Sequence, residues 1–256
     1  MSRYFSVARG LAWRLLHSLV TNPLLFLPPM LMPIFFFTAF AGGLSAISNA
    51  PGFQYGPGYT SFIFVFVLCQ AAAFGGVFSG FSIAADFQFG FGRRLLLATP
   101  HRSALILGYG IVAVIRAAIT LTVVTLIGLL VGMNISGDGL DLFGMYGLAA
   151  IINVTGLLFA AGVALRFRSL QATPLMQVPI FLFLFLAPVY VPRNLLGGWV
   201  HAVAPFNPAT HVMETTRDLI AGTGSEYLAT LGIVVALLSA VFVFAMRGLR
   251  QAEAAG

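Results

Sequence analysis

Long runs of apolar residues, separated by short polar segments, dominate the chain. Six of these runs are about 20 residues or longer, enough for a helix to cross the roughly 30 Å hydrocarbon core of a bilayer. The pattern predicts an all-α integral membrane protein with six transmembrane helices. The expected spans are Pro23–Ile47, Tyr59–Ala85, Ala104–Met133, Leu142–Leu165, Pro174–Val191 and Tyr227–Met246. The fifth is the least regular, because Pro179 and Pro188 interrupt it.

Residues 1–22 show the apolar periodicity of an amphipathic helix. The apolar face comprises Phe5, Ala8, Ala12, Leu15 and Leu19. Arg3, Arg14 and His17 lie on the opposite face, and Asn22-Pro23 ends the pattern. We therefore expect an interfacial helix in the plane of the membrane surface, which either anchors the chain or helps to dock a partner.

The segment 192–226 is too polar for a span and too long for a tight turn. Asn207 can cap a helix, Pro208 suits its first turn, and Gly222 can end it. Such a helix rises only about 21 Å, too little to cross the membrane. The segment therefore predicts short re-entrant or amphipathic helices before the last span, in which Glu214 and Arg217 can pair.

The basic residues orient the chain. All 13 are arginines. In the six-span arrangement, ten fall on the side that holds both termini, and only Arg193 and Arg217 fall on the other. Because arginine-rich short loops stay in the cytoplasm, both termini and the loop 86–103 are expected to be cytoplasmic, and 192–226 extracellular.

Composition excludes several classes of protein. The chain is 59% hydrophobic and only 8% charged, so it cannot cover a water-facing surface. Its net charge of +6 is spread over separate loops and does not indicate nucleic-acid binding. Without lysine it lacks a P-loop. The four histidines show no metal-ligand spacing, and we expect neither a metal nor a cofactor on this chain.

Two features lie within the spans. Arg116 is the one arginine inside a span, and should face protein or a water cavity. It is either a structural residue, bonded to carbonyl oxygens at the end of a span or snorkelling inward, or part of a translocation path. Small-residue pairs at helical spacing permit close helix contacts. They are Gly76 with Gly80 and Gly128 with Gly132.

Two stretches resemble a known family. The first runs from Asp86 to Gly108 and has an acidic start, a glycine, then Leu-Leu-x-x-Pro, a basic residue and a glycine in the next span. The second runs from Pro205 to Gly222, with Asn-Pro-x-Thr followed by Glu, Arg and Gly. Together with the six-span order, they resemble type-2 ABC exporter permeases, most closely the daunorubicin-resistance group of drug and lipid exporters. One departure is Phe89, where that family often carries a second acid.

The resemblance implies that separate ATP-hydrolysing subunits drive transport. Two permease chains, identical or related, would form the path through the membrane. Two ABC ATP-binding subunits, which hold ATP and Mg, would dock from the cytoplasm. Their docking element would comprise Asp86, Gly90, Arg93, Arg94, Leu95, Leu96, Leu97, Pro100 and Arg102. In this comparison the arginines meet acidic residues of the ATPase, the three leucines insert into its groove, and the amino-terminal helix flanks the contact.

The resulting expectation is a single membrane domain over residues 1–256 that is not itself an enzyme. It would have a cytoplasmic helix (1–22), five spans (23–191) with the coupling loop 86–103, the outer segment 192–226, and a last span with its tail (227–256). Its role would be ATP-driven export of a hydrophobic or amphipathic drug, antibiotic or lipid across a bacterial plasma membrane, with membrane lipid as a partner and no nucleic acid. Two other classes stay open, an intramembrane enzyme of lipid or glycan metabolism and an ion-coupled carrier. The lack of acids within the spans disfavours the carrier.

Overall fold

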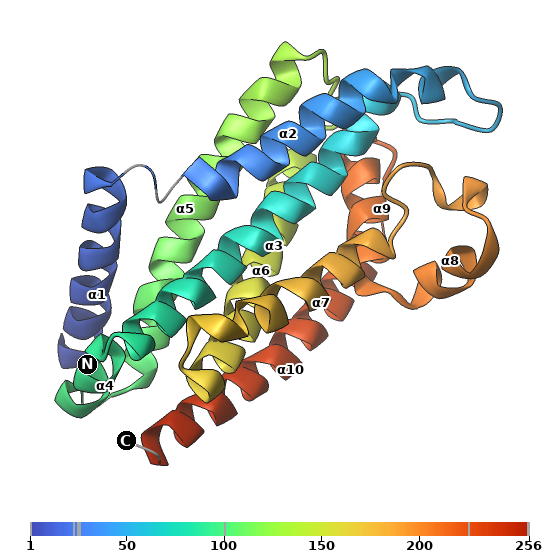
Figure 1. Cartoon of the computed structure of the whole chain (residues 1–256). Helices are drawn as coiled ribbons and strands as arrows, with labels where there is room; N and C mark the ends of the chain where they lie inside the picture. Colours follow the sequence, from blue (N-terminus) through green and yellow to red (C-terminus); the bar gives the residue numbers. More distant parts are fainter. Residues whose placement is uncertain (1, 23, 25–26, 100, 225, 255–256) are drawn as a thin grey trace.

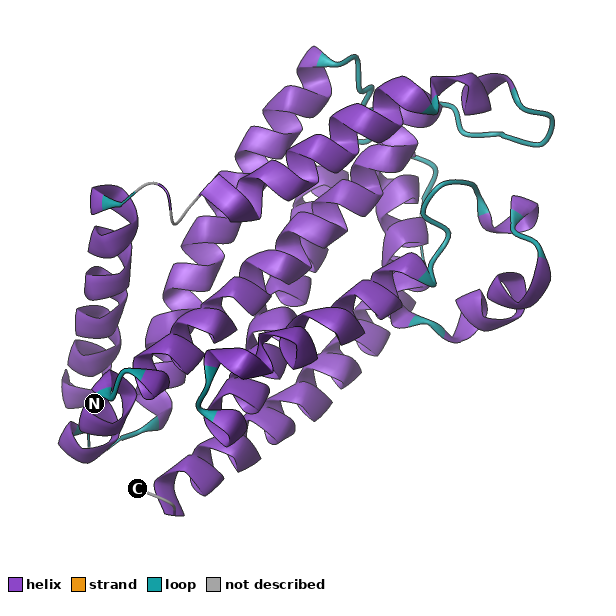
Figure 2. Cartoon of the chain, viewed as in Figure 1, coloured by secondary structure: helices purple, strands orange, loops and turns teal. Residues whose placement is uncertain are grey.

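The computed structural model describes residues 2–22, 24, 27–99, 101–224 and 226–254. Within these ranges every regular element is a helix (Figure 2). The α-helices are α1 (Ser2–Thr21), α2 (Leu27–Gly43), α3 (Gly58–Gln88), α4 (Phe91–Ala98), α5 (Ser103–Leu130), α6 (Gly139–Phe167), α7 (Thr173–Phe185), α8 (Gly198–Val203), α9 (Pro208–Ala221) and α10 (Tyr227–Ala254). The 3-10 helices are η2 (Ser45–Asn49), η3 (Leu170–Ala172), η4 (Arg193–Leu195) and η5 (Ala204–Phe206).

Among the described residues, four helices are long and apolar enough to cross a membrane, namely α3, α5, α6 and α10. They coincide with the second, third, fourth and sixth expected spans. At the first and fifth expected spans lie the shorter helices α2, with 17 residues, and α7, with 13. The fifth ends at Phe185 instead of Val191, because Pro188 disfavours helical geometry at Ala187 before it. The count of six spans stays a prediction.

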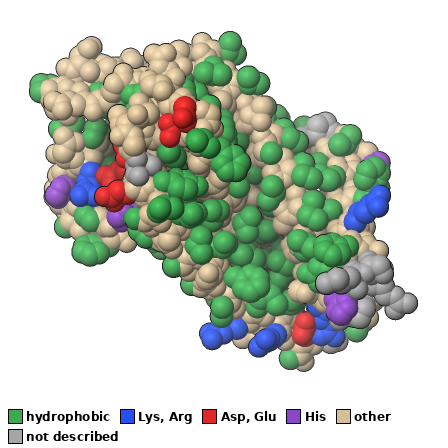
Figure 3. All heavy atoms as spheres, turned by 180° about the vertical axis from the view of Figure 1, so that it is seen from behind, with side chains coloured by type: hydrophobic (Ala, Val, Ile, Leu, Met, Phe, Trp, Pro, Cys, Tyr) green, Lys and Arg blue, Asp and Glu red, His purple; other side chains and the backbone are tan. Residues whose placement is uncertain are grey.

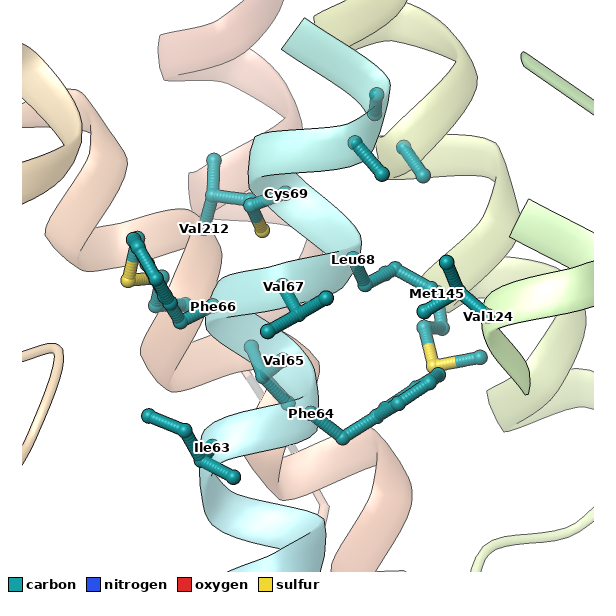
Figure 4. Packing of buried hydrophobic residues seen from close by; sticks show 14 of the residues in the cluster. Ile63, Phe64, Val65, Phe66, Val67, Leu68, Cys69, Val124, Met145 and Val212 are labelled. Atoms are coloured by element: carbon teal, nitrogen blue, oxygen red, sulfur yellow. The ribbon is translucent and has the colours of Figure 1, made fainter. Parts of the chain in front are cut away.

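Helix α3 forms the centre of the molecule. It contacts α2, α5, α6, α7 and α9 (Figure 1), and every residue from Phe62 to Gly76 is buried. In Figure 4, Phe66 points to one side of α3, while Phe64 and Leu68 point to the other, toward Met145 of α6. Apolar composition alone does not explain this burial, because α10 is at least as apolar and is largely exposed.

Glycines allow α3 and α6 to approach each other closely. A Cβ on Gly76 would lie 2.1 Å from the carbonyl oxygen of Asn153, and one on Gly80 would lie 2.3 Å from Cβ of Ala160. Gly156 of α6 faces Ala73 in the same way, at 2.5 Å from its carbonyl oxygen. The expected contact role of Gly76 and Gly80 is confirmed.

The second glycine pair behaves differently. Gly132 has φ +95° and lies in the turn that follows α5, with open space around it. Gly128 faces the side chains of Phe64 and Met133. The expected helix contact therefore holds for Gly128, which faces Phe64 of α3, and is wrong for Gly132. Gly132 has a conformational role instead, because a positive φ suits glycine.

The amino-terminal helix is confirmed over Ser2–Thr21, and it packs along α5 (Figure 1). Ala8, Leu11 and Ala12 are buried, and Gly108 of α5 lets the backbone at Ala8 approach. Trp13, off the apolar face, is 71% exposed. The in-plane orientation stays a prediction.

The two ends of the described chain lie at the same end of the molecule, beside α4 (Figure 1). Helix α8 and the loops around it lie at the opposite end (Figure 1). This arrangement agrees with the expectation that both termini and the loop 86–103 share one side. On the face shown in Figure 3, charged side chains gather toward the ends, and the band between them is largely apolar.

The close contact between α3 and α6 predicts that Gly76→Ala is destabilising. The added Cβ would meet backbone atoms of α6 that cannot move independently. We expect a loss of about 1–3 kcal/mol in stability, measured as a lower thermal midpoint of the detergent-purified protein by circular dichroism. Gly232→Ala in α10 is the matched control, because a Cβ there meets open space. An unchanged midpoint for Gly76→Ala would contradict the close packing.

Candidate functional site

The stretch that carries the predicted docking residues forms a short helix in its own right. Helix α3 continues through Asp86 to Gln88, and Gly90 then adopts a left-handed conformation with φ +81°. This turn reverses the chain into α4 within two residues. Most of the expected loop 86–103 is therefore helical. Pro100 lies outside the described residues.

Helix α4 is amphipathic, with one face toward the protein. Gly92 and Leu96 are buried, and a Cβ at Gly92 would lie 2.7 Å from the ring of Phe87. Arg93, Arg94 and Leu97 are exposed, Leu97 by 74%. The exposed side therefore offers two cations and one large apolar side chain to whatever lies beyond it.

The structure divides the three leucines that sequence reasoning treated as equivalent. Leu97 is exposed, Leu95 is half-buried, and Leu96 is only 6% exposed within the core. Because a single helical turn cannot direct three consecutive side chains to one surface, the expected insertion of Leu96 into a partner is corrected. Leu96 anchors α4 to the rest of the chain.

Asp86 joins three helices instead of facing solvent. It accepts hydrogen bonds from the guanidinium of Arg14 in α1 and from the hydroxyl of Tyr109 in α5. Arg14 also lies over the ring of Phe91, 4.0 Å from its centroid. This Asp86 cluster, comprising Asp86, Arg14 and Tyr109, ties the start of α4 to α1 and α5. Sequence reasoning placed Arg14 on a polar helix face but gave no sign of its partner.

The carboxyl end of α10 contacts residues that flank α4 and α6. Arg102 pairs with Glu253, with 3.3 Å between Nη1 and Oε2. Arg168, just after α6, donates to the carbonyl oxygen of Ala252 at 3.0 Å. Gln88 at the end of α3 accepts from the backbone N–H of Leu170 at 2.7 Å. Four side chains make these three contacts, and sequence reasoning named only Arg102 among them as a candidate site residue.

A cavity of about 380 Å³ lies among these contacts. Its lining comes from α3, α4, α10 and the residues that flank α5 and α6. The lining residues are Phe87, Gln88, Gly90, Arg93, Leu96, Leu97, Arg102, Arg168, Ala252 and Glu253. We call α4 with this cavity the α4 platform. Its basic and apolar surface suits an acidic protein surface with an apolar insertion point.

The opposite end of the molecule is organised by α9. The side chain of Asn207 accepts from the backbone N–H of Ala209 at 3.0 Å, Pro208 opens the helix, and Gly222 ends it with φ +66°. These three expected roles are confirmed. Asn207 also donates from Nδ2 to the carbonyl oxygen of Phe183 at 2.6 Å, which joins α9 to α7.

The expected pairing of Glu214 with Arg217 is wrong. Glu214 pairs with Arg193, with 3.5 Å between Oε2 and Nη1. Arg217 is buried and lies over the ring of Phe62, 3.5 Å from its centroid. Because the helix turns Arg217 toward α3, its guanidinium reaches carbonyl oxygens inside the molecule instead of the neighbouring acid.

Arg116 was expected to face either protein or a water cavity, and in the structure its guanidinium faces the protein. Its Nη2 donates to the carbonyl oxygen of Gly75 at 2.8 Å and to Oγ of Ser79 at 2.6 Å, both in α3. Both acceptors lie within α3 and not at its end, so they differ from the span-end carbonyls expected. Among the described residues, no group of three or more histidine, cysteine, aspartate or glutamate side chains could hold a metal ion.

Comparisons with known proteins give matches over most of the chain. The model of a family described as ABC-2 type transporter matches residues 7–221. Over 239 residues the chain is 26% identical to the daunorubicin resistance ABC transporter permease protein DrrB1 of Streptomyces coeruleorubidus. The aligned region covers 90% of this chain and 81% of that relative. It is also 25% identical over 215 residues to the putative transport permease ycf38 of Pyropia yezoensis, with 82% and 72% covered.

The Asp86 cluster predicts that Asp86→Asn loosens α1. The substitution removes the charge that holds Arg14, and hydrogen bonds to charged groups contribute about 1.5–3 kcal/mol. We expect faster hydrogen exchange along α1, measured by mass spectrometry in detergent. Arg14→Gln should give the same effect, and the double variant should add little to either single one. Arg9→Gln, an exposed arginine on the same helix, is the control. Additive effects would contradict a direct pair.

Proposed function

Because the chain belongs to the ABC-2 type transporter family, we propose that it is the permease subunit of an ATP-driven exporter. Its cargo is a hydrophobic or amphipathic compound, such as a drug, an antibiotic or a lipid. Separate ABC ATP-binding subunits, two per transporter, hold ATP and Mg and bind from the cytoplasm of a bacterial cell. A second permease chain, identical or related, completes the path. The intramembrane enzyme and the ion-coupled carrier are set aside, because the family is one of ABC transporters.

The single observation that carries this proposal is the exposed face of α4. Arg93, Arg94 and Leu97 project from a helix whose other face is anchored in the protein. A transporter subunit without a nucleotide site needs a rigid surface on which an external motor can act. An apolar anchor beside cations is the composition expected of a specific protein contact.

The anchoring of α4 supports a mechanical role. The turn at Gly90 connects α4 directly to α3, the most enclosed helix of the chain. The Asp86 cluster and the Arg102–Glu253 pair link the same region to α1, α5 and α10. When the ATPase subunits close on ATP, a displacement of α4 would therefore move several helices together.

A second cavity supports the proposal of an apolar cargo. It has a volume of about 130 Å³ and lies between α3, α6, α7, α9 and α10. Its lining is apolar except for Thr155, and includes Cys69, Phe159 and Phe183. The similarity to a relative named for daunorubicin resistance supports the same substrate class. We place both termini in the cytoplasm, from the arginine distribution.

The first test is co-purification. The tagged chain, isolated from its native membranes in mild detergent, should bring an ABC ATP-binding subunit in equal number, identified by mass spectrometry. Arg93→Glu with Arg94→Glu should abolish this association, because the reversed charges repel an acidic partner surface. Arg247→Glu with Arg250→Glu, two exposed arginines of α10 outside the α4 platform lining, is the matched control. Retention of the ATPase by the first variant would refute the docking assignment, and a wild-type chain that always purifies alone would refute the exporter proposal.

Adjacent leucines provide a second, independent test. Leu97→Ala should leave the thermal midpoint unchanged but weaken ATPase binding about tenfold or more, since it removes an exposed anchor. Leu96→Ala should lower stability by about 2–5 kcal/mol, because it empties a core position. Binding is measured by titrating the purified ATPase subunit onto the reconstituted permease. If Leu96→Ala weakened binding without loss of stability, the assignment of the two leucines would be reversed.

A further inference from the structure

Arg116 is a buried cation whose hydrogen bonds are incomplete. It is 5% exposed in the middle of α5. Both of its hydrogen bonds leave from Nη2, and Nε is buried without a partner among the described residues. A guanidinium offers five donors, so much of its capacity in this site is unused by the chain.

The chain supplies no carboxylate for this charge. All seven acidic residues lie in the described ranges, and in none of the ion pairs there does Arg116 take part. Asp86 is the acidic residue of α3, the helix to which Arg116 bonds, and its carboxylate is held by Arg14 and Tyr109. Because an uncompensated charge away from water is costly, the missing anion is expected from outside the chain.

A cavity of about 140 Å³ reaches Arg116 from the side of α1. Its volume is several times the roughly 10–15 Å³ that one water molecule needs. The lining residues are Leu15, Ser18, Leu19, Pro29, Phe78, Ser79, Ser82, Tyr109, Val112 and Arg116. The guanidinium and the hydroxyl groups of Ser79, Ser82 and Tyr109 lie on the α3 and α5 walls. Helix α1 contributes Leu15, Leu19 and the hydroxyl of Ser18, and α2 contributes Pro29.

We propose that this cavity binds the anionic head group of a phospholipid from the leaflet on the α4 side, with Arg116 as the counter-ion. The phosphate would receive hydrogen bonds from the free guanidinium donors and from serine hydroxyls. Ser18 is exposed at the cavity, so the mouth lies beside the end of α1, the helix expected at the membrane surface. A membrane lipid reaches this place without crossing the protein.

The walls favour a lipid over a free anion. A free phosphate would lose its hydration on entering the site, and the hydrogen bonds available there would replace only part of that hydration. A phospholipid is already at the membrane, and its acyl chains can lie against the apolar side chains of α1 and α2. The site is separate from the α4 platform, and its occupation does not depend on the ATPase.

The test is lipid binding by native mass spectrometry of the purified full chain in a neutral detergent. Short-chain phosphatidylglycerol should bind about tenfold or more tightly than short-chain phosphatidylcholine of the same length, because charge-assisted hydrogen bonds add to the apolar contact. Arg116→Gln should abolish this preference. Arg9→Gln, which removes an exposed arginine of α1, should keep it. Equal preference in Arg116→Gln and wild type would overturn the proposal.

Two further measurements cover the remaining outcomes. Ser18→Trp blocks the mouth at an exposed position and leaves Arg116 intact, so it should also abolish the preference while the circular dichroism spectrum stays unchanged. It decides the question if Arg116→Gln does not fold, and unchanged binding in this variant would refute the cavity. Inorganic phosphate should fail to displace the lipid at millimolar concentration. Displacement would show a free-anion site and overturn the lipid assignment.

Discussion

The close approach of α3 and α6 is the constraint on which the rest of the arrangement depends. At Gly76, Gly80 and Gly156 the two backbones approach so closely that the Cβ of any larger residue would clash with the facing helix. In a membrane, where lipid is as apolar as leucine, such contact replaces the hydrophobic effect as the source of helix association. It fixes α3 as the enclosed helix, and α5, α7 and α9 then pack around it.

Enclosing α3 has consequences for the polar residues that border it. Arg217 directs its guanidinium toward α3 near the start of that helix, at Phe62, and Arg116 does so within the helix, at Gly75, and both donate to backbone carbonyl oxygens there. Asn153 does the same from α6, donating to the carbonyl oxygen of Ala72 at 2.9 Å. Because a helical carbonyl can accept a second hydrogen bond, α3 serves as the acceptor for side chains that could not otherwise leave water. The central helix therefore stabilises the buried polar groups as well as the apolar core.

The sequence predicted much of this and missed what depends on three dimensions. Apolar length located α3, α5 and α6 to within a few residues, and it located the start of α10, which continues to Ala254, past the expected end at Met246. Cap chemistry at Asn207, Pro208 and Gly222 located α9. The prolines made the fifth span uncertain, and the helix there is indeed shorter than expected. Partners of charged residues could not be predicted, because Arg14 is 72 residues from Asp86 and Arg193 is 21 residues before Glu214. Spacing along a helix suggested the wrong partner for Arg217 and gave none for Glu253.

The same limitation explains why α4 was expected to be a loop. Charge and turn residues between two apolar runs indicate a connection, and they do not show that eight residues form a helix fixed on both sides. The difference matters for how an external motor could act. A flexible loop would absorb displacement, whereas α4 is joined to α3 through a two-residue turn and held through Leu96, the Asp86 cluster and Arg102. Force applied to the exposed side of α4 would therefore reach the helix that contacts α2, α5, α6, α7 and α9, and rigid attachment at this point is what the proposed docking of an external ATPase requires.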